Sequence, residues 1–241
     1  MNVTKELTIL AVTKMHGGVC TAGIDADGHW VRPVRPPDAK ASRYDTITDY
    51  CLLPLDFFHG GQSHLANLGV TRFFLTEASP QPPHVEDWMM DLRRKPQLIR
   101  KHSPDEQSEF LAAHVESGVS LLAANPARSL ALIRPEIFSF SFGWNQTGDD
   151  VAVRASFQAG EVEVGDAGCT DLRLRALGRR MLEKSGGKAC SLDEADFERQ
   201  GKGATYLAIG LSRLYHGKHW PILVGVHSLP ELVVEVDYAK L

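Results

Sequence analysis

The sequence predicts a mainly β protein with a few helices, organised as two small Greek-key barrels packed together. Two observations predict this class. The 21 glycines and 13 prolines punctuate short segments along all 241 residues, which favours turn-rich β-structure over a helical bundle. Arg32-Pro33 in the first half and Arg134-Pro135 in the second each end a β-like run, so the two halves echo each other.

The first half opens with short strands separated by tight turns. Gly17-Gly18 bounds the first turn, and the second ends in Asp27-Gly28, a pair that supplies positive φ at little steric cost. The pattern predicts strands over residues 9–12, 19–24, 29–34 and 70–76, with an apolar run over 50–58.

Two helices are expected to close the first half. A short one covers residues 86–95 and stops before Pro96. The second starts at Ser103, which is followed by proline at the first helical position and Glu106 at the third, the pattern of a capping box. It ends near residue 117 or continues, broken, to residue 124.

Asn125-Pro126 marks the midpoint and predicts two domains, 1–125 and 126–241. A helix from Asp171 to Lys184 is closed by Gly186-Gly187, and a capping box at Ser191 to Glu194 starts a short helix that ends at Gly201. The remaining segments predict strands over residues 129–133, 137–144, 151–158, 161–164, 206–211 and 221–226.

This content suits a particular kind of barrel. Five or so strands and an inserted helix per half are what an OB-fold needs, and such barrels commonly bind oligonucleotides on one sheet face. Strand periodicity alone leaves another small barrel, such as a PUA-like one, open. We therefore expect two OB-like barrels, the first with a helical insertion and the second likewise.

Composition limits the kind of partner and the compartment. The net charge of −4 and the pI near 6.2 mean that any nucleic-acid surface must be a local patch, because affinity for phosphates comes from cations. The cysteines are scattered, which fits reduced thiols and a cytoplasmic location; they are Cys20, Cys51, Cys169 and Cys190. Neither a signal peptide nor a membrane-spanning run is expected.

The first cationic cluster surrounds the opening turns. Its members are candidate ligands for nucleic acid: Lys14, His16, Trp30, Arg32 and Arg35. Alternation in a strand puts Trp30 and Arg32 on one side, a pairing that can stack a base and clamp a phosphate. The competing interpretation is a buried Trp30 edge that a solvated arginine covers.

Two more clusters lie in the second half. In the helix from Asp171, Arg173, Arg180 and Lys184 share one flank, while Arg175 and Arg179 occupy the other. Near the end, a predicted hairpin tip at Gly217 gathers cations, histidines and an aromatic: Arg213, His216, Lys218, His219 and Trp220. Either cluster can contact phosphates, or it can be a solvated surface.

No motif declares a catalytic chemistry. The chain has no His-Glu-x-x-His, no Gly-x-Ser-x-Gly and no phosphate-binding loop, so we expect no catalytic residues, no metal and no cofactor. The paired acids Glu161/Glu163 and Glu235/Asp237 read as polar faces of edge strands.

The opening residues resemble a known family, the prokaryotic dual OB domain-containing proteins. The resemblance rests on Thr13, Lys14, Gly17, Gly18, Cys20, Ala22, Gly23, Gly28, Trp30, Val31, Arg32 and Pro33, and more loosely on Thr170-Asp171 with Arg173, on 206–213 and on 218–220. It implies two OB-like barrels and a nucleic-acid or nucleotide ligand. Met15-His16 departs from the more basic step expected there.

The leading functional hypothesis is a non-catalytic protein that binds RNA or single-stranded DNA by stacking and local basic patches. The alternative is a nucleotide or modified-base sensor or enzyme, with a cleft between the halves lined by Cys20, His16 and Asp171. A third is an adaptor for a protein partner in a multi-gene system. No membrane partner is expected.

Overall fold

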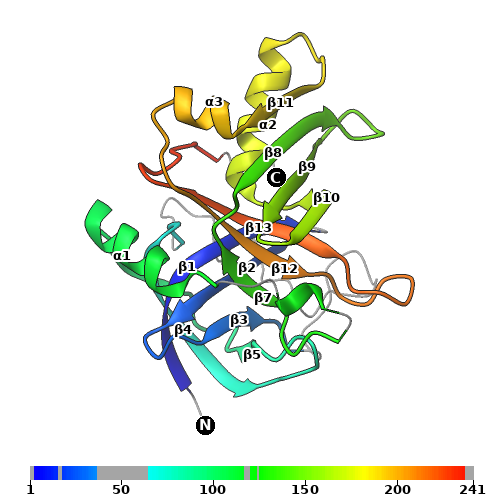
Figure 1. Ribbon diagram of the computed structural model, residues 1–241. Helices are drawn as coiled ribbons and strands as arrows, with labels where there is room; N and C mark the ends of the chain where they lie inside the picture. Colours follow the sequence, from blue (N-terminus) through cyan, green and yellow to red (C-terminus); the bar gives the residue numbers. More distant parts are fainter. Residues whose placement is uncertain (1–2, 16–17, 37–64, 117–119, 124, 237–241) are drawn as a thin grey trace.

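The described part of the chain forms two β-sheets that pack against each other, with three α-helices at the periphery (Figure 1). The structure, a computed structural model, describes residues 3–15, 18–36, 65–116, 120–123 and 125–236. The predicted apolar run at 50–58, His16 and Cys51 lie outside these residues. None of the helices in the described part has the length and apolar composition that crossing a membrane requires.

The first sheet contains a closed ring of five strands. In spatial order the six strands of this sheet are β1 (Val3–Met15), β2 (Gly18–Asp25), β3 (Trp30–Val34), β5 (Asp87–Met90), β4 (Gly69–Ala78) and β6 (Gln97–Lys101). The first five in this order form the ring. An additional pairing of β1 with β4 closes the ring, and β3 runs parallel to β5. This is a Greek-key barrel of the OB-like kind.

The second sheet repeats the same connectivity with different edges. Its spatial order is β11 (Cys190–Asp193), β8 (Ile137–Trp144), β9 (Val151–Ala159), β10 (Val162–Cys169), β13 (Pro221–Ser228), β12 (Thr205–Leu211) and β7 (Leu130–Ile133). The run β8-β9-β10-β13-β12 matches β1-β2-β3-β5-β4, and β10 is parallel to β13 as β3 is to β5. The predicted class is confirmed: the protein is mainly β, with a closed five-stranded barrel and a second sheet of the same strand order, consistent with two OB-like barrels.

The helices confirm two of the three sequence expectations for capped helices. In α1 (Pro104–His114) the Ser103 hydroxyl accepts from the Glu106 N–H while the Glu106 carboxylate accepts from the Ser103 N–H. In α2 (Leu172–Lys184) Asp171 is the N-cap and accepts from the N–H groups of Arg173 and Leu174. A 3₁₀ turn, η3 (Ser120–Leu122), precedes the second sheet.

The third helix cap lies two residues beyond its predicted position. The short helix α3 (Glu194–Arg199) is capped by Asp193, whose carboxylate accepts from the N–H of Asp196. Ser191, the expected cap, lies in β11 and pairs with Ser141. The preceding residues are extended because β11 adds to the edge of β8, so the helix can start only where that pairing ends.

The helix expected over residues 86–95 was wrong. Residues 87–90 form β5, which is inserted between β3 and β4, with Asp87 opposite Arg32 and Met90 opposite Leu75. Residues 91–94 turn, with the Asp91 carboxylate accepting from the Arg93 N–H. Pairing on both sides of β5 outweighs the helical preference of this segment, a tertiary effect that local propensity does not report.

The two sheets meet through an apolar layer between β1 and the second sheet. It contains buried side chains from both halves, among them Leu10, Ala22, Trp30, Leu132 and Tyr206. A Cβ on Gly225 of β13 would lie 2.0 Å from the Leu10 carbonyl oxygen, so only glycine permits this approach of the strands. The halves are therefore joined by close packing.

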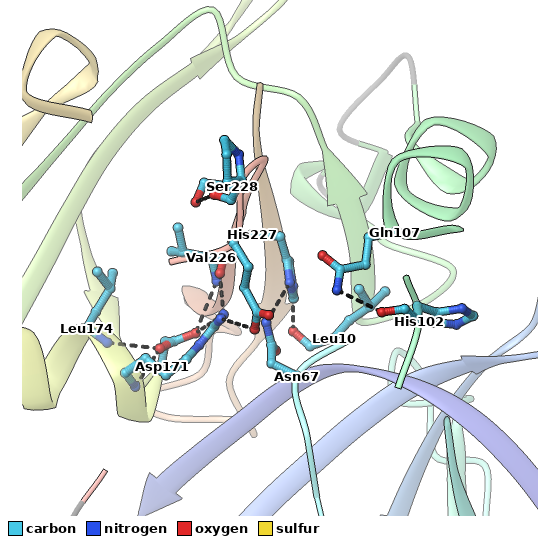
Figure 2. A network of polar contacts seen from close by, with 12 residues as sticks. Leu10, Asn67, His102, Gln107, Asp171, Leu174, Val226, His227 and Ser228 are labelled. Carbon is cyan, nitrogen blue, oxygen red and sulfur yellow. Dashed lines mark hydrogen bonds and ion pairs between the residues drawn. The ribbon is translucent and has the colours of Figure 1, made fainter. Parts of the chain in front are cut away.

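A buried polar network crosses the same contact (Figure 2). His227 Nε2 of β13 donates to the Leu10 carbonyl of β1 at 2.9 Å, and the Asn67 amide lies 3.0 Å from His227 Nδ1. The Asp171 carboxylate accepts from the Val226 N–H at 3.1 Å. Burial, and then the positive charge of Arg173, lower the pKa of His227 to about 3, so this histidine is neutral at pH 7.

Candidate nucleic-acid interface

The first and third cationic clusters converge on one buried carboxylate. Arg32 Nε of β3 donates to Asp87 Oδ1 at 2.7 Å, and Arg213, just beyond β12, donates to Asp87 Oδ2. Asp87 is 1% exposed, and both arginine side chains are largely buried. Because Arg32 belongs to the first sheet and Arg213 to the second, Asp87 joins the two halves at this point. We call these three residues the Asp87 junction.

Two histidines pack beside the Asp87 junction. The rings of His84 and His219 meet edge to face, with their centroids 5.3 Å apart. Burial, followed by the charges of Arg32 and Arg213, lowers the pKa of His84 to about 2. The His84 ring is therefore uncharged at neutral pH and adds no repulsion to the two guanidinium groups. His219 Nδ1 donates to the Ser212 carbonyl at 2.8 Å, which fixes the base of the hairpin that follows.

The segment between β12 and β13 is a hairpin with exposed aromatic rings, as the sequence predicted for its tip. Tyr215 and Lys218 exchange backbone hydrogen bonds of 2.9 and 3.2 Å, and His216 and Gly217 between them have φ of 50° and 75°, the positive values of a tight hairpin turn. Tyr215 is 55% exposed and Trp220 49%.

Internal contacts orient these rings while leaving them exposed. Trp220 Nε1 donates to the Tyr215 carbonyl at 3.2 Å, and Lys218 Nζ lies 6.0 Å from the centre of the Trp220 ring. A groove of about 680 Å³ lies beside the hairpin. Its walls are η3 and β10 on one side and Lys218, His219 and Pro221 on the other. Lys218 therefore lines an open groove, while Tyr215 and Trp220 are exposed elsewhere on the same hairpin.

The rest of the first cluster is placed differently. Trp30 is 8% exposed and packs in the apolar layer between the sheets, and Arg35 is buried as well. Lys14 lies near Arg175 and Arg179 of α2. Burial, and the charges of these two arginines, lower the pKa of Lys14, although Asp150 acts in the opposite direction. His16 is outside the described residues. The cluster is thus divided among the Asp87 junction, the apolar layer and α2.

The arginines of α2 are engaged by protein groups, whereas Lys184 at its end is exposed. Arg173 donates to the Val226 carbonyl and lies 3.5 Å from an Asp171 carboxylate oxygen within the buried polar network. Arg180 donates to the Glu235 carbonyl at 3.0 Å. On the other flank, Arg175 and Arg179 both pair with Asp150. The structure does not bring Arg173 and Arg180 to the hairpin surface.

A small cavity lies between the two sheets, where the small-ligand alternative places its cleft. It measures about 70 Å³ and is lined by residues of both halves, including Cys20, Thr170, Arg32 and Arg213. Asp171 is not among its lining residues. An engineered cavity of about 150 Å³ admits benzene, so a nucleobase would enter this one only if the halves moved apart.

One group of potential metal ligands occurs among the described residues, in the turn between β2 and β3. Side-chain atoms of Asp25, Asp27 and His29 lie within 4.8 Å of one another. Asp25 already accepts from Lys5 Nζ at 2.6 Å and from the N–H groups of Asp27 and His29. These bonds use both carboxylate oxygens to stabilise the turn.

Sequence reasoning missed three residues of this region. Asp87 and His84 fall in or before the segment that was assigned to a helix, so their approach to Arg32 and Arg213 had no local signal. Tyr215 lay inside the third cluster and could have been included, because an aromatic next to a predicted turn residue is often exposed.

The fold and this surface define a class: a protein of two OB-like units that presents aromatic rings and cations on a hairpin. Residues 5–226 match the family described as Dual OB-containing domain. That match covers most of the chain, and the chain belongs to this family. No curated protein matches it.

Proposed function

We propose that this protein binds RNA or single-stranded DNA through the hairpin between β12 and β13. The observation that carries the proposal is the joint exposure of Tyr215 and Trp220 beside Lys218 on one hairpin. Bases stack on exposed aromatic faces with little regard to sequence, at about 1–3 kcal/mol per base. A neighbouring lysine neutralises a phosphate, which makes the affinity depend on salt.

The Asp87 junction supports the proposal by holding the hairpin in place. Arg213 and His219 tie the base of the hairpin to the first barrel through Asp87 and His84. A surface that is ordered before binding loses less conformational entropy when the ligand arrives. In this proposal Arg32 and Arg213 position the hairpin, whereas Lys218 and Trp220 contact the nucleic acid.

The test is fluorescence anisotropy with labelled oligo-dT and oligo-U of about 16 nucleotides, the upper site size of one OB-fold. We expect wild-type binding that weakens steeply as salt rises. Trp220→Ala should weaken binding about 5- to 150-fold, the equivalent of one stacked base. Ile137→Ala is the matched control, since Ile137 is also a large exposed apolar residue, on β8.

Two results would overturn the proposal. One is that the protein binds no oligonucleotide even at low salt. The other is thermal stabilisation by mononucleotides but not by oligomers, which would favour the cavity between the sheets and the sensor or enzyme alternative. Co-purification of a stoichiometric protein without nucleic acid would indicate the adaptor instead.

A further inference from the structure

A second basic surface lies on the outer face of the first barrel, away from every cluster singled out in the sequence. It is formed by the edge strand β6, its neighbour β4 and the turn before β6. Its cations are Arg72, Arg93, Arg94, Lys95, Arg100 and Lys101. We call it the β4–β6 face. In a chain whose net charge is −4, this is a local concentration of positive charge.

Strand register places three of the arginines in a row. In β4, Thr71, Phe73 and Leu75 face inward and are buried, whereas Val70, Arg72 and Phe74 lie on the opposite, outer face. Phe74 is nevertheless only 6% exposed. Arg100 of β6 is directly opposite Val70, so it lies on the same outer face. The guanidinium carbon of Arg94 lies 3.4 Å from the centre of the Phe74 ring.

The row therefore has a regular repeat. Arg100 of β6 lies beside Val70, Arg72 is on β4 itself and Arg94 lies over the Phe74 ring. Outward residues of a strand recur about every 6.8 Å. Successive phosphates of an extended single strand are separated by a similar distance. A flat strand of this kind matches an extended polyanion better than it matches a compact anion.

The ion pairs that Arg72 and Arg100 make on this face compete only weakly with a phosphate for these arginines. Arg72 pairs with Glu6 and Arg100 with Glu106, and all four side chains are exposed to solvent. Exposed ion pairs contribute little to stability, so their arginines can turn to phosphates at small cost. Lys95 and Lys101 make no ion pair with a described residue, and both are exposed.

We propose that the β4–β6 face binds the phosphate backbone of the same single-stranded nucleic acid whose bases stack on the hairpin. This inference rests on the proposed function and extends it. In Figure 1, α1, which directly follows β6, and the β12–β13 hairpin extend toward opposite sides of the molecule. A strand that contacts both surfaces must pass around the first barrel, so long oligonucleotides bind more tightly than short ones.

The test measures the salt dependence of oligonucleotide binding. Each neutralised phosphate of a single strand contributes about 0.7 to the slope of log K against log salt. The triple variant Arg72→Gln/Arg94→Gln/Arg100→Gln should lower the slope by roughly 2 with a long oligonucleotide. The matched control is Arg134→Gln/Lys188→Gln/Arg199→Gln, which removes three exposed cations of the second half and should leave the slope unchanged.

A second measurement uses the unaltered protein. Lys95 and Lys101 should be protected from amine acetylation when oligonucleotide is bound, as read by mass spectrometry, whereas Lys188 should not be. If the wild-type protein binds but the triple variant keeps the full slope and the two lysines stay reactive, the β4–β6 face is not the phosphate track. If the wild-type protein binds no oligonucleotide, the proposed function itself fails.

Discussion

The two halves share one strand order and differ in how their sheets end. In the first half, β1 pairs with β4 and closes a five-stranded ring. In the second half, β12 takes the place of β4. On the side where β4 pairs with β1, β12 pairs with β7 and not with β8. The other edge is extended by β11. Because β8 and β12 each pair with another strand, they do not pair with each other. The same strand order therefore gives a closed barrel in the first half and an open sheet in the second.

The halves also treat their tryptophans differently. Trp30 of the first half is buried between the sheets, whereas Trp220 of the second is half exposed on a hairpin. Both are nucleic-acid ligands predicted from the sequence, with Trp30 as the first candidate for stacking. The difference shows that the contact between the halves uses the tryptophan of the first barrel as core and leaves that of the second exposed. Three predictions test this division, the largest effect first.

Replacing Asp87 should have an effect as large as any of these, because it leaves two mostly buried arginines without their shared carboxylate. Asp87→Ala should lower the free energy of unfolding by about 3–5 kcal/mol, measured by urea denaturation. Asp166→Asn removes the charge from the exposed pair with Arg154 and keeps a residue type suited to the positive φ of this position, so it should cost at most about 1 kcal/mol. Equal losses in the two variants would show that the Asp87 junction does not join the halves.

The two tryptophans should separate stability from binding. Trp30→Ala should cost about 3–5 kcal/mol of stability, because it empties a large volume in the apolar layer. Trp220→Ala should change stability by no more than about 0.5 kcal/mol, while weakening oligonucleotide binding as described above. Denaturation and anisotropy on both variants give the answer. A stable Trp30→Ala protein that has lost binding would make Trp30, and not Trp220, the stacking residue.

The contact between the halves should weaken in acid through His227, since its pKa of about 3 is below that of the unfolded chain. Above about pH 6.5 both states are neutral and the stability is full. As the pH falls toward 3, the unfolded state binds a proton that the folded state rejects, at about 1.4 kcal/mol per pH unit. His84, beside the Asp87 junction, has a pKa lowered to about 2 and acts in the same direction.

Unfolding free energies measured at intervals from pH 7 to 4.5 check this dependence. His227→Gln should flatten the slope by about one proton, whereas His29→Gln, which alters an exposed side chain, should leave it as in the wild type. An unchanged slope in His227→Gln would mean that His227 titrates freely in the folded protein.

Local sequence signals predicted several elements well. The Ser103 capping box and the Asp171 cap start α1 and α2 where expected, because a cap is a contact between residues two or three apart. The turn at Gly217 was predicted for a similar reason, since a positive φ depends mainly on the residue itself. The helix prediction for residues 86–95 was wrong because β5 pairs with β3 and β4, which lie outside that segment.

The candidate site divides along the same line. Lys218, His219 and Trp220 could be found from the sequence because one hairpin holds them together. The meeting of Arg32 with Arg213 at Asp87 could not, and neither could the row of Arg72, Arg94 and Arg100, which comes from strand register and one ring contact. The division of the chain at residues 125 and 126 stays a prediction.

The sequence by itself determined the class of fold, its turns and caps, and the supply of cations and aromatics, because those depend on interactions among neighbours. Only the tertiary structure decided which of these side chains are available. The burial of Trp30 and of most of the Arg173 side chain follows from how β1 packs on β13. The exposure of Trp220 follows from a hairpin that projects beyond that contact, since a side chain's access to solvent depends on residues that lie far away in the sequence.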